Sequence, residues 1–220
     1  MALTKFNFNS FDVTSAASKG LGFNASANGF STIDPGAMTL IKTLTASSSA
    51  TLSFVHGSSD VVLDSTYPVY MFKFYNCHPA TDDVEFSFNG SIDGGSNYNV
   101  TKTTTFIRAY HDEADSAAAL QYDTSDDLAQ STSYQTLGGS VGNDNDQCCS
   151  GTLHLFDPSS TTFVKHFTAS FNNYINTDFS IASYIAGYFN NTNDIDAISF
   201  KFSSGNIDSG TIKLYGISDS

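Results

Sequence analysis

The side chains of this sequence that are best able to do chemistry are carboxylates and hydroxyls gathered in turn-like segments. Asp144 and Asp146, with Asn143 and Asn145 between them, place oxygen ligands at alternate positions after a glycine-rich stretch. Ca²⁺ prefers such hard oxygen donors, although the stretch lacks the closing bidentate Glu of an EF-hand loop. Asp144 and Asp146 are therefore candidate calcium ligands, and a solvated acidic loop is the alternative. No other cofactor is expected. Similar acidic groups occur at residues 123–127 and 194–196.

The sequence contains a hydrolase motif but not the local structure that the motif requires. Residues 138–142 read Gly-Gly-Ser-Val-Gly and match G-x-S-x-G, the pattern of a nucleophile elbow. That elbow needs a helix directly after the serine, and residues 143–147 are typical of a turn. The two glutamates, Glu85 and Glu113, are the remaining candidates for a glycosidase pair, and nothing in the sequence places them at the spacing that this reaction needs. We therefore expect no enzymatic activity.

The three cysteines, Cys77, Cys148 and Cys149, do not form a disulfide framework, because a bridge between the adjacent pair would be strained. Their spacing to His78 and His154 also lacks the gap that lets two ligands face one zinc ion. We expect a reduced protein made in the cytoplasm. The N-terminal residues show no apolar signal region, and no apolar run approaches the length of a membrane span.

The charge balance argues against nucleic acid as a partner. The formal net charge is −13, and the nine basic residues are scattered along the chain. A protein that binds DNA or RNA needs clustered Lys and Arg to neutralise phosphates. Direct binding to nucleic acid is therefore not expected.

The composition predicts strands joined by turns. The chain has 32 Ser, 23 Thr and 20 Asp but 2 Glu, together with 30 Phe and Tyr residues. Asp favours turns, and aromatic residues favour pleated, half-buried surfaces. Val84, Phe86 and Phe88 alternate as the inward face of a strand, while residues 70–75 are apolar on both faces, as in a central strand. We predict an all-β, jelly-roll-like antiparallel sandwich of about ten strands, with turns at regular spacing.

Two regions depart from this pattern. Residues 112–121 predict one short helix in a connection, because Asp115 and Ser116 precede an alanine run. Residues 1–36 are rich in Gly and small polar residues around Phe23 and Phe30. We predict an irregular N-terminal arm over 1–36, used for attachment or assembly through these two phenylalanines, and a single sandwich domain over 37–220.

Aromatic side chains give the sequence a second functional interpretation. A carbohydrate-binding module presents exposed aromatic rings beside Asn and Asp on a sheet face or in loops. Tyr98, Tyr110 and Tyr122 are the principal candidates for contact with a glycan, and further tyrosines occur at positions 134, 184 and 188. The absence of Trp weakens this interpretation.

Several blocks of the sequence resemble virion proteins of marine and cyanobacterial tailed bacteriophages. The most specific is residues 194–217, which read DIDAISFKFSSGNIDSGTIKLYGI. Others are LDSTYPVYMF at 63–72, NCHPATDD at 76–83, DGGSNY at 93–98 and GTLHLFDPSSTT at 151–162. The resemblance covers about residues 40–217 and includes no active-site motif.

The resemblance implies a structural component of a virion. We therefore expect a non-enzymatic protein of the virion surface, either an exterior capsid decoration or a module of a tail or fibre. Its expected partners are the major capsid or tail proteins of the same particle and further copies of itself, as a trimer or dimer. The alternative is a carbohydrate-binding module or adhesin tip that recognises a glycan on the host surface.

Overall fold

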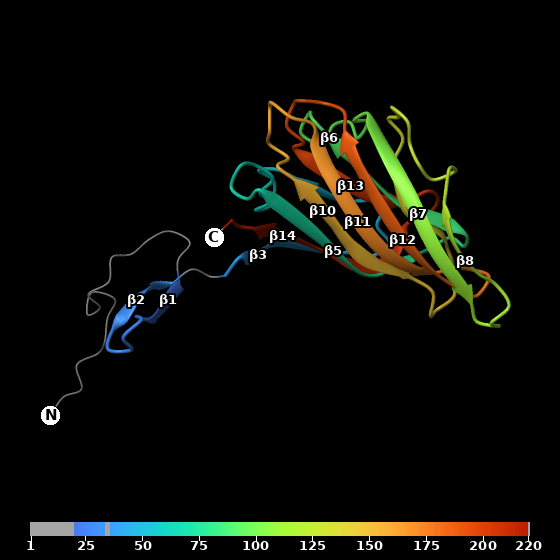
Figure 1. Cartoon of the computed structure of the whole chain (residues 1–220), viewed down its shortest axis with the longest axis horizontal. Coiled ribbons are helices and arrows are strands. Elements are labelled where there is room, and N and C mark those ends of the chain that lie inside the picture. Colours follow the sequence, from blue (N-terminus) through green and yellow to red (C-terminus); the bar gives the residue numbers. More distant parts are fainter. Residues whose placement is uncertain (1–19, 34–35, 220) are drawn as a thin grey trace. The chain divides into compact units, whose positions relative to one another are not determined.

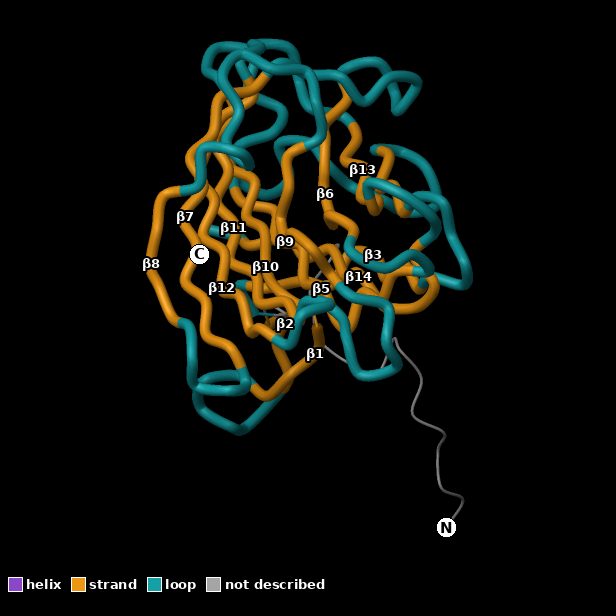
Figure 2. Tube along the Cα trace, turned by 90° about the vertical axis from the view of Figure 1, so that its right-hand side faces the viewer, coloured by secondary structure: helices purple, strands orange, loops and turns teal. Residues whose placement is uncertain are grey.

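The computed structural model describes residues 20–33 and 36–219, which belong to two compact units that meet in sequence between Thr39 and Leu40. The described residues form fourteen strands and no helix. Figure 2 shows these residues as strands joined by loops. None of them forms a helix long and apolar enough to cross a membrane.

The strands of the first unit are β1 (Gly20–Phe23) and β2 (Phe30–Ile33). The remaining strands are β3 (Met38–Thr45), β4 (Leu52–Val55), β5 (Val69–Pro79), β6 (Val84–Ser91), β7 (Lys102–Asp112), β8 (Ala118–Tyr122), β9 (Gln135–Val141), β10 (Cys149–Phe156), β11 (Lys165–Tyr174), β12 (Phe179–Phe189), β13 (Ala197–Phe202) and β14 (Ile207–Ile217).

The second unit is a two-sheet sandwich. Its larger sheet has eight strands in the order β3-β14-β5-β10-β11-β12-β7-β8, which lie side by side in Figure 1. The smaller sheet has four strands in the order β4-β13-β6-β9. The predicted all-β, jelly-roll-like antiparallel sandwich is confirmed.

Phenylalanine rings fill the space between the sheets. Phe86 and Phe88 of β6 are completely buried, as their alternation predicts. Phe74 and Phe200 approach to 4.9 Å between ring centroids at 75°, and Phe88 meets Phe167 at 5.0 Å and 89°. Such edge-to-face pairs stabilise a core beyond the area that they bury.

The outer face of the smaller sheet is closed by loops. Asn89, Ser91 and Ser199 lie on this face and are buried. The Asn89 side-chain amide donates to the backbone carbonyls of Tyr98 (2.8 Å) and Thr132 (2.9 Å), so loops on both sides are fastened over the sheet. Buried polar groups require such partners. The outer face of the larger sheet is consequently the face of the sandwich that remains open.

The predicted helix at residues 112–121 is wrong. These residues form a tight turn and the start of β8, which pairs with β7 from His111↔Ala118 to Ile107↔Tyr122. The Asp112 carboxylate accepts hydrogen bonds from the backbone N–H groups of Ser116 and Ala117, each at 2.8 Å. The aspartate therefore closes a turn, and pairing with β7 overrides the helix propensity of the alanines.

Residues 20–33 of the predicted irregular arm form a regular hairpin, β1 with β2, in register from Gly20↔Ile33 to Phe23↔Phe30. The Asn24 side-chain oxygen accepts from the Asn28 N–H at 3.2 Å and orders the connecting turn. The rest of the arm, residues 1–19 and 34–35, lies outside the described residues.

Candidate functional site

The candidate site is the open outer face of the eight-stranded sheet. The strand register aligns Tyr122, Ile107, Tyr184, Ser170 and Thr152 in one row across β8, β7, β12, β11 and β10. The large side chains Tyr122, Ile107 and Tyr184 are exposed, and the hydroxyls of Ser170 and Thr152 follow them. One side of the face is thus aromatic and apolar, and its middle is rich in hydroxyls.

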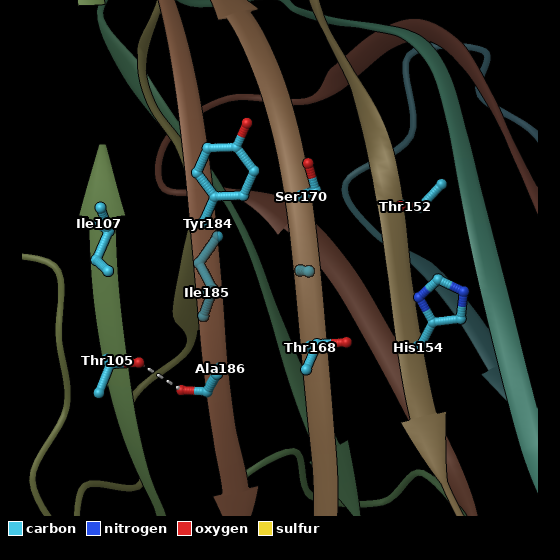
Figure 3. A pocket seen from close by; sticks show the side chains of 10 residues that line it. Thr105, Ile107, Thr152, His154, Thr168, Ser170, Tyr184, Ile185 and Ala186 are labelled. Atoms are coloured by element: carbon cyan, nitrogen blue, oxygen red, sulfur yellow. Dashed lines mark hydrogen bonds between the residues drawn. The ribbon is translucent and has the colours of Figure 1, made fainter. Parts of the chain in front are cut away.

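A second row lies directly beside the first. Thr105, Ala186, Thr168 and His154 are register partners or neighbours on β7, β12, β11 and β10. The Thr105 hydroxyl donates to the Ala186 carbonyl at 3.3 Å, as the dashed line in Figure 3 shows. Because Thr168 and Ala186 have small side chains, the floor between the Tyr184 ring and the His154 ring is low.

The result is a shallow groove, which we call the outer-sheet groove. Its central depression has a volume of about 370 Å³ between Tyr184 and His154 (Figure 3). A depression of about 550 Å³ adjoins it and shares Thr152, Ser170 and Tyr184. Another, of about 300 Å³, shares Thr105, Thr168 and Ala186 and includes His166 and Tyr188.

The groove is close to electrically neutral. Neither Asp nor Glu lines any of these three depressions, and Lys73, at the end of the second one, is the charged side chain among their linings. Burial lowers the pKa of His154 below its ordinary value of 6.5, so this imidazole is uncharged at neutral pH. The groove therefore offers hydroxyls, imidazoles and an exposed ring to a ligand, with little net charge.

The structure separates the three tyrosines that the sequence names for glycan contact. Tyr122 lies on the outer face of β8, beside the groove. Tyr110 points to the opposite face, where its ring packs against Phe179 at 5.8 Å. Tyr98 is half-buried beside Gly95 and lines none of the three depressions. Tyr184, a secondary candidate in the sequence, has 53% of its surface exposed and lines the groove.

The proposed calcium ligands lie in an organised turn. Asp144 donates its N–H to the side-chain oxygen of the buried Gln147 at 3.1 Å, and its carbonyl accepts from the Gln147 N–H at 2.9 Å. Asp144 and Asp146 are both exposed. Among residues 20–33 and 36–219, no three His, Cys, Asp or Glu side chains are grouped closely enough to hold a metal ion.

The G-x-S-x-G segment lies at the end of β9, and residues 143–146 continue it as a turn. Glu85 and Glu113 lie in different surroundings: Glu85 acts electrostatically on Asp126, whereas Glu113 accepts a hydrogen bond from Tyr174.

The acidic group at residues 123–127 lies between β7 and β9, and the structure adds Glu85 to it. Asp123 forms an ion pair with Arg108, with Nε to Oδ2 at 3.0 Å. Asp126 is close by, and burial together with the charges of Asp123 and Glu85 raises its pKa to about 6. None of these carboxylates lines any of the three depressions, so the cluster lies outside the outer-sheet groove.

Phe23 and Phe30, which the sequence predicts to take part in assembly, form a stacked pair on the N-terminal hairpin. Their ring centroids are 5.2 Å apart at 22°. Phe23 keeps 71% of its surface exposed, and Leu21, two positions earlier on the same face of β1, keeps 52%. Comparison with family models, curated proteins and solved structures finds no match to this chain.

Proposed function

We propose that this chain is a non-enzymatic structural protein of a bacteriophage particle. Its N-terminal segment makes the contacts of attachment or self-assembly, and its sandwich is the displayed module on the virion surface, as a capsid decoration or as part of a tail or fibre. The observation that carries the proposal is the N-terminal hairpin, which belongs to a different compact unit from the sandwich and has Leu21 and Phe23 exposed.

A hairpin of two four-residue strands is marginally stable by itself in water. Exposed aromatic side chains on such a small unit cost free energy unless another surface covers them. The partners that fit are a second copy of the chain, in a dimer or trimer, and the capsid or tail proteins of the same particle. The resemblance of residues 194–217 to phage virion proteins supports the same assignment.

The test replaces Phe23 and Phe30 with Ser in the full-length chain. The matched control is Phe163→Ser, because Phe163 is as exposed as Phe23 (70% against 71%) but lies in the connection between β10 and β11. We expect the wild-type and control chains to be oligomers by light scattering and to co-sediment with purified phage particles. The double variant should be a monomer that stays in the supernatant. If all three proteins behave alike, the hairpin is not the assembly element.

A second function, glycan recognition, is favoured by the outer-sheet groove. Its floor of Thr and Ser hydroxyls and the exposed Tyr184 ring suit a neutral sugar, which offers hydroxyls at its edges and C–H groups on its faces. A phage protein of this kind would contact a glycan on the host surface.

This second function is tested on an array of neutral oligosaccharides. We expect Tyr184→Ala to lose binding, whereas Tyr98→Ala and the exposed control Phe163→Ala should retain it. Binding that survives Tyr184→Ala, or absence of binding by the wild-type chain, would remove the groove from consideration as a glycan site.

A further inference from the structure

Cys77 and Cys149, which are 72 positions apart in the sequence, face each other inside the sandwich. They are register partners across β5 and β10, and both are buried. The Cys149 Sγ lies 3.5 Å from the Cys77 carbonyl oxygen. Directly opposed residues of antiparallel strands have Cα atoms about 4.5–5.5 Å apart. Disulfides span about 4.4–6.8 Å between Cα atoms, so the backbone already has the required spacing.

A β-bulge creates this pairing. Gly151 pairs with Phe74, and an uninterrupted register would place Asn76 opposite Cys149. Asn76 has a positive φ of 47° and is the residue that the bulge inserts, so Cys77 moves into the position opposite Cys149. The Asn76 N–H donates to the Ser150 hydroxyl at 2.9 Å, which holds the bulge against β10.

The neighbouring strand β14 holds the bulge from its other side. Gly210 has a φ of 126°, and a Cβ atom at this position would lie 2.7 Å from the Cys77 Cα. Only glycine permits this approach of the backbones. The pair is therefore fixed in place by both neighbours of β5.

Cys148 supplies the route by which an oxidant reaches the buried pair. It is half-buried, and it is close enough to Cys77 for the two to interact electrostatically. The buried thiols themselves are not open to a molecule from solution, whereas Cys148 is partly open.

We propose that Cys77 and Cys149 form a disulfide when the protein meets an oxidising medium, with Cys148 as the entry thiol. This inference concerns a covalent modification site and does not depend on the proposed virion role. The oxidant is a low-molecular-weight disulfide such as oxidised glutathione.

The exchange proceeds in three thiol–disulfide displacements, in which atoms and electrons balance. The Cys148 thiolate attacks oxidised glutathione and releases one glutathione thiolate. The Cys77 thiolate then attacks the Cys148 sulfur and releases the second. Finally the Cys149 thiolate attacks the Cys77 sulfur and returns Cys148 to a thiolate. In total, two protein thiols lose two electrons and two protons, and one glutathione disulfide becomes two thiols.

The surroundings make this reaction slow at neutral pH. Burial raises the pKa of Cys148, and burial with the neighbouring thiols raises the pKa of Cys149 well above its ordinary value. Because the thiolate is the attacking species, the rate should rise with pH. A slow reaction keeps the chain reduced in the cytoplasm and allows the bond to form afterwards.

The experiment incubates the full-length reduced chain in oxidised glutathione, blocks free thiols, digests the protein without reductant and identifies linked peptides by mass spectrometry. We expect one intramolecular Cys77–Cys149 link, formed faster at pH 9 than at pH 7. We also expect a rise in Tm of about 5 °C or more, because a bond across a long loop constrains the unfolded chain.

Three variants distinguish the roles of the three cysteines. Cys77→Ala and Cys149→Ala should each abolish the link and the rise in Tm, with folding under reducing conditions checked by circular dichroism. Cys148→Ser should form the same link at least about tenfold more slowly, because the entry thiol is gone. A reaction that ends in a Cys77–Cys148 bridge, in links between chains or in no link would overturn the proposal, and the wild-type result stands even if an alanine variant fails to fold.

Discussion

At the scale of single residues, two buried lysines distinguish this core from an ordinary sandwich. Lys102 on β7 and Lys165 on β11 are both register partners of Phe189, and both are almost completely buried. The Lys102 ammonium donates to the backbone carbonyls of Val100 (3.2 Å) and Ser133, and Lys165 donates to those of Asn191 and Asn193. The lysines therefore fasten loops at the end of the sandwich.

The first prediction concerns the pH dependence of Lys102. Burial lowers its pKa from 10.5 to about 7. Between these values the unfolded chain binds more protons than the folded one, so this residue makes stability rise with pH. Relative to Lys102→Met, the free energy of unfolding of the wild type should rise by up to about 1.4 kcal/mol per pH unit from pH 7 to pH 10. Urea unfolding of both proteins measures this difference, and parallel pH profiles would contradict it.

The second prediction concerns Asp126, whose pKa is raised from 3.8 to about 6, chiefly by burial. The folded chain binds more protons than the unfolded one in this window, so the residue makes stability fall as pH rises through it. Because Asp126 is partly exposed, we expect Asp126→Asn to stabilise the protein by about 1–2 kcal/mol at pH 7 and by almost nothing at pH 4. Urea unfolding at both pH values checks this, with the exposed Asp60→Asn as control. An equal gain at both values would show that the charge is not the cause.

At the scale of elements, the bulge in β5 depends on the glycine of the adjacent strand. Gly210→Ala should destabilise the protein by about 2 kcal/mol or more, because the new Cβ meets the Cys77 backbone and φ is positive. Gly57→Ala is the matched control, since Gly57 also has positive φ (75°) but open space around its Cβ position, and it should cost about 1 kcal/mol. Thermal unfolding under reducing conditions compares the two. Equal losses would mean that the close approach to Cys77 is unimportant.

The strands themselves follow from the sequence more readily than their connections. The alternation of Val84, Phe86 and Phe88 predicts the buried face of β6 correctly, because a strand with one face in a core needs that period. The region after Asp112 was predicted as a helix, since local propensity does not reveal that Ala118–Tyr122 can pair with β7. Pairing with β7 therefore determines the conformation of these residues, and their local helix propensity does not.

The candidate sites could be predicted from the sequence even less well than the connections between strands. Tyr184 and Thr152 become neighbours of one groove through the register of three strands, and a single sequence does not specify register. Cys77 and Cys149 meet through a one-residue bulge at Asn76. Phe23 and Phe30 could be selected from the sequence because they stand out among the small residues of a short local segment.

At the scale of the whole molecule, the chain combines a large phenylalanine-filled sandwich with a small hairpin that exposes aromatic side chains. The sandwich has a core sufficient for independent folding, whereas the hairpin does not. This difference is the physical basis for our proposal that the sandwich is displayed and the N-terminal segment makes the attachment.

The most direct test of this account is the solution mass of the full-length chain beside a chain that begins at residue 37, measured by light scattering together with thermal unfolding. We expect the full-length protein to be a defined dimer or trimer and the truncated protein to be a folded monomer. If both proteins are monomers of equal Tm, or if both form the same oligomer, the N-terminal segment does not drive self-assembly and the central claim is contradicted.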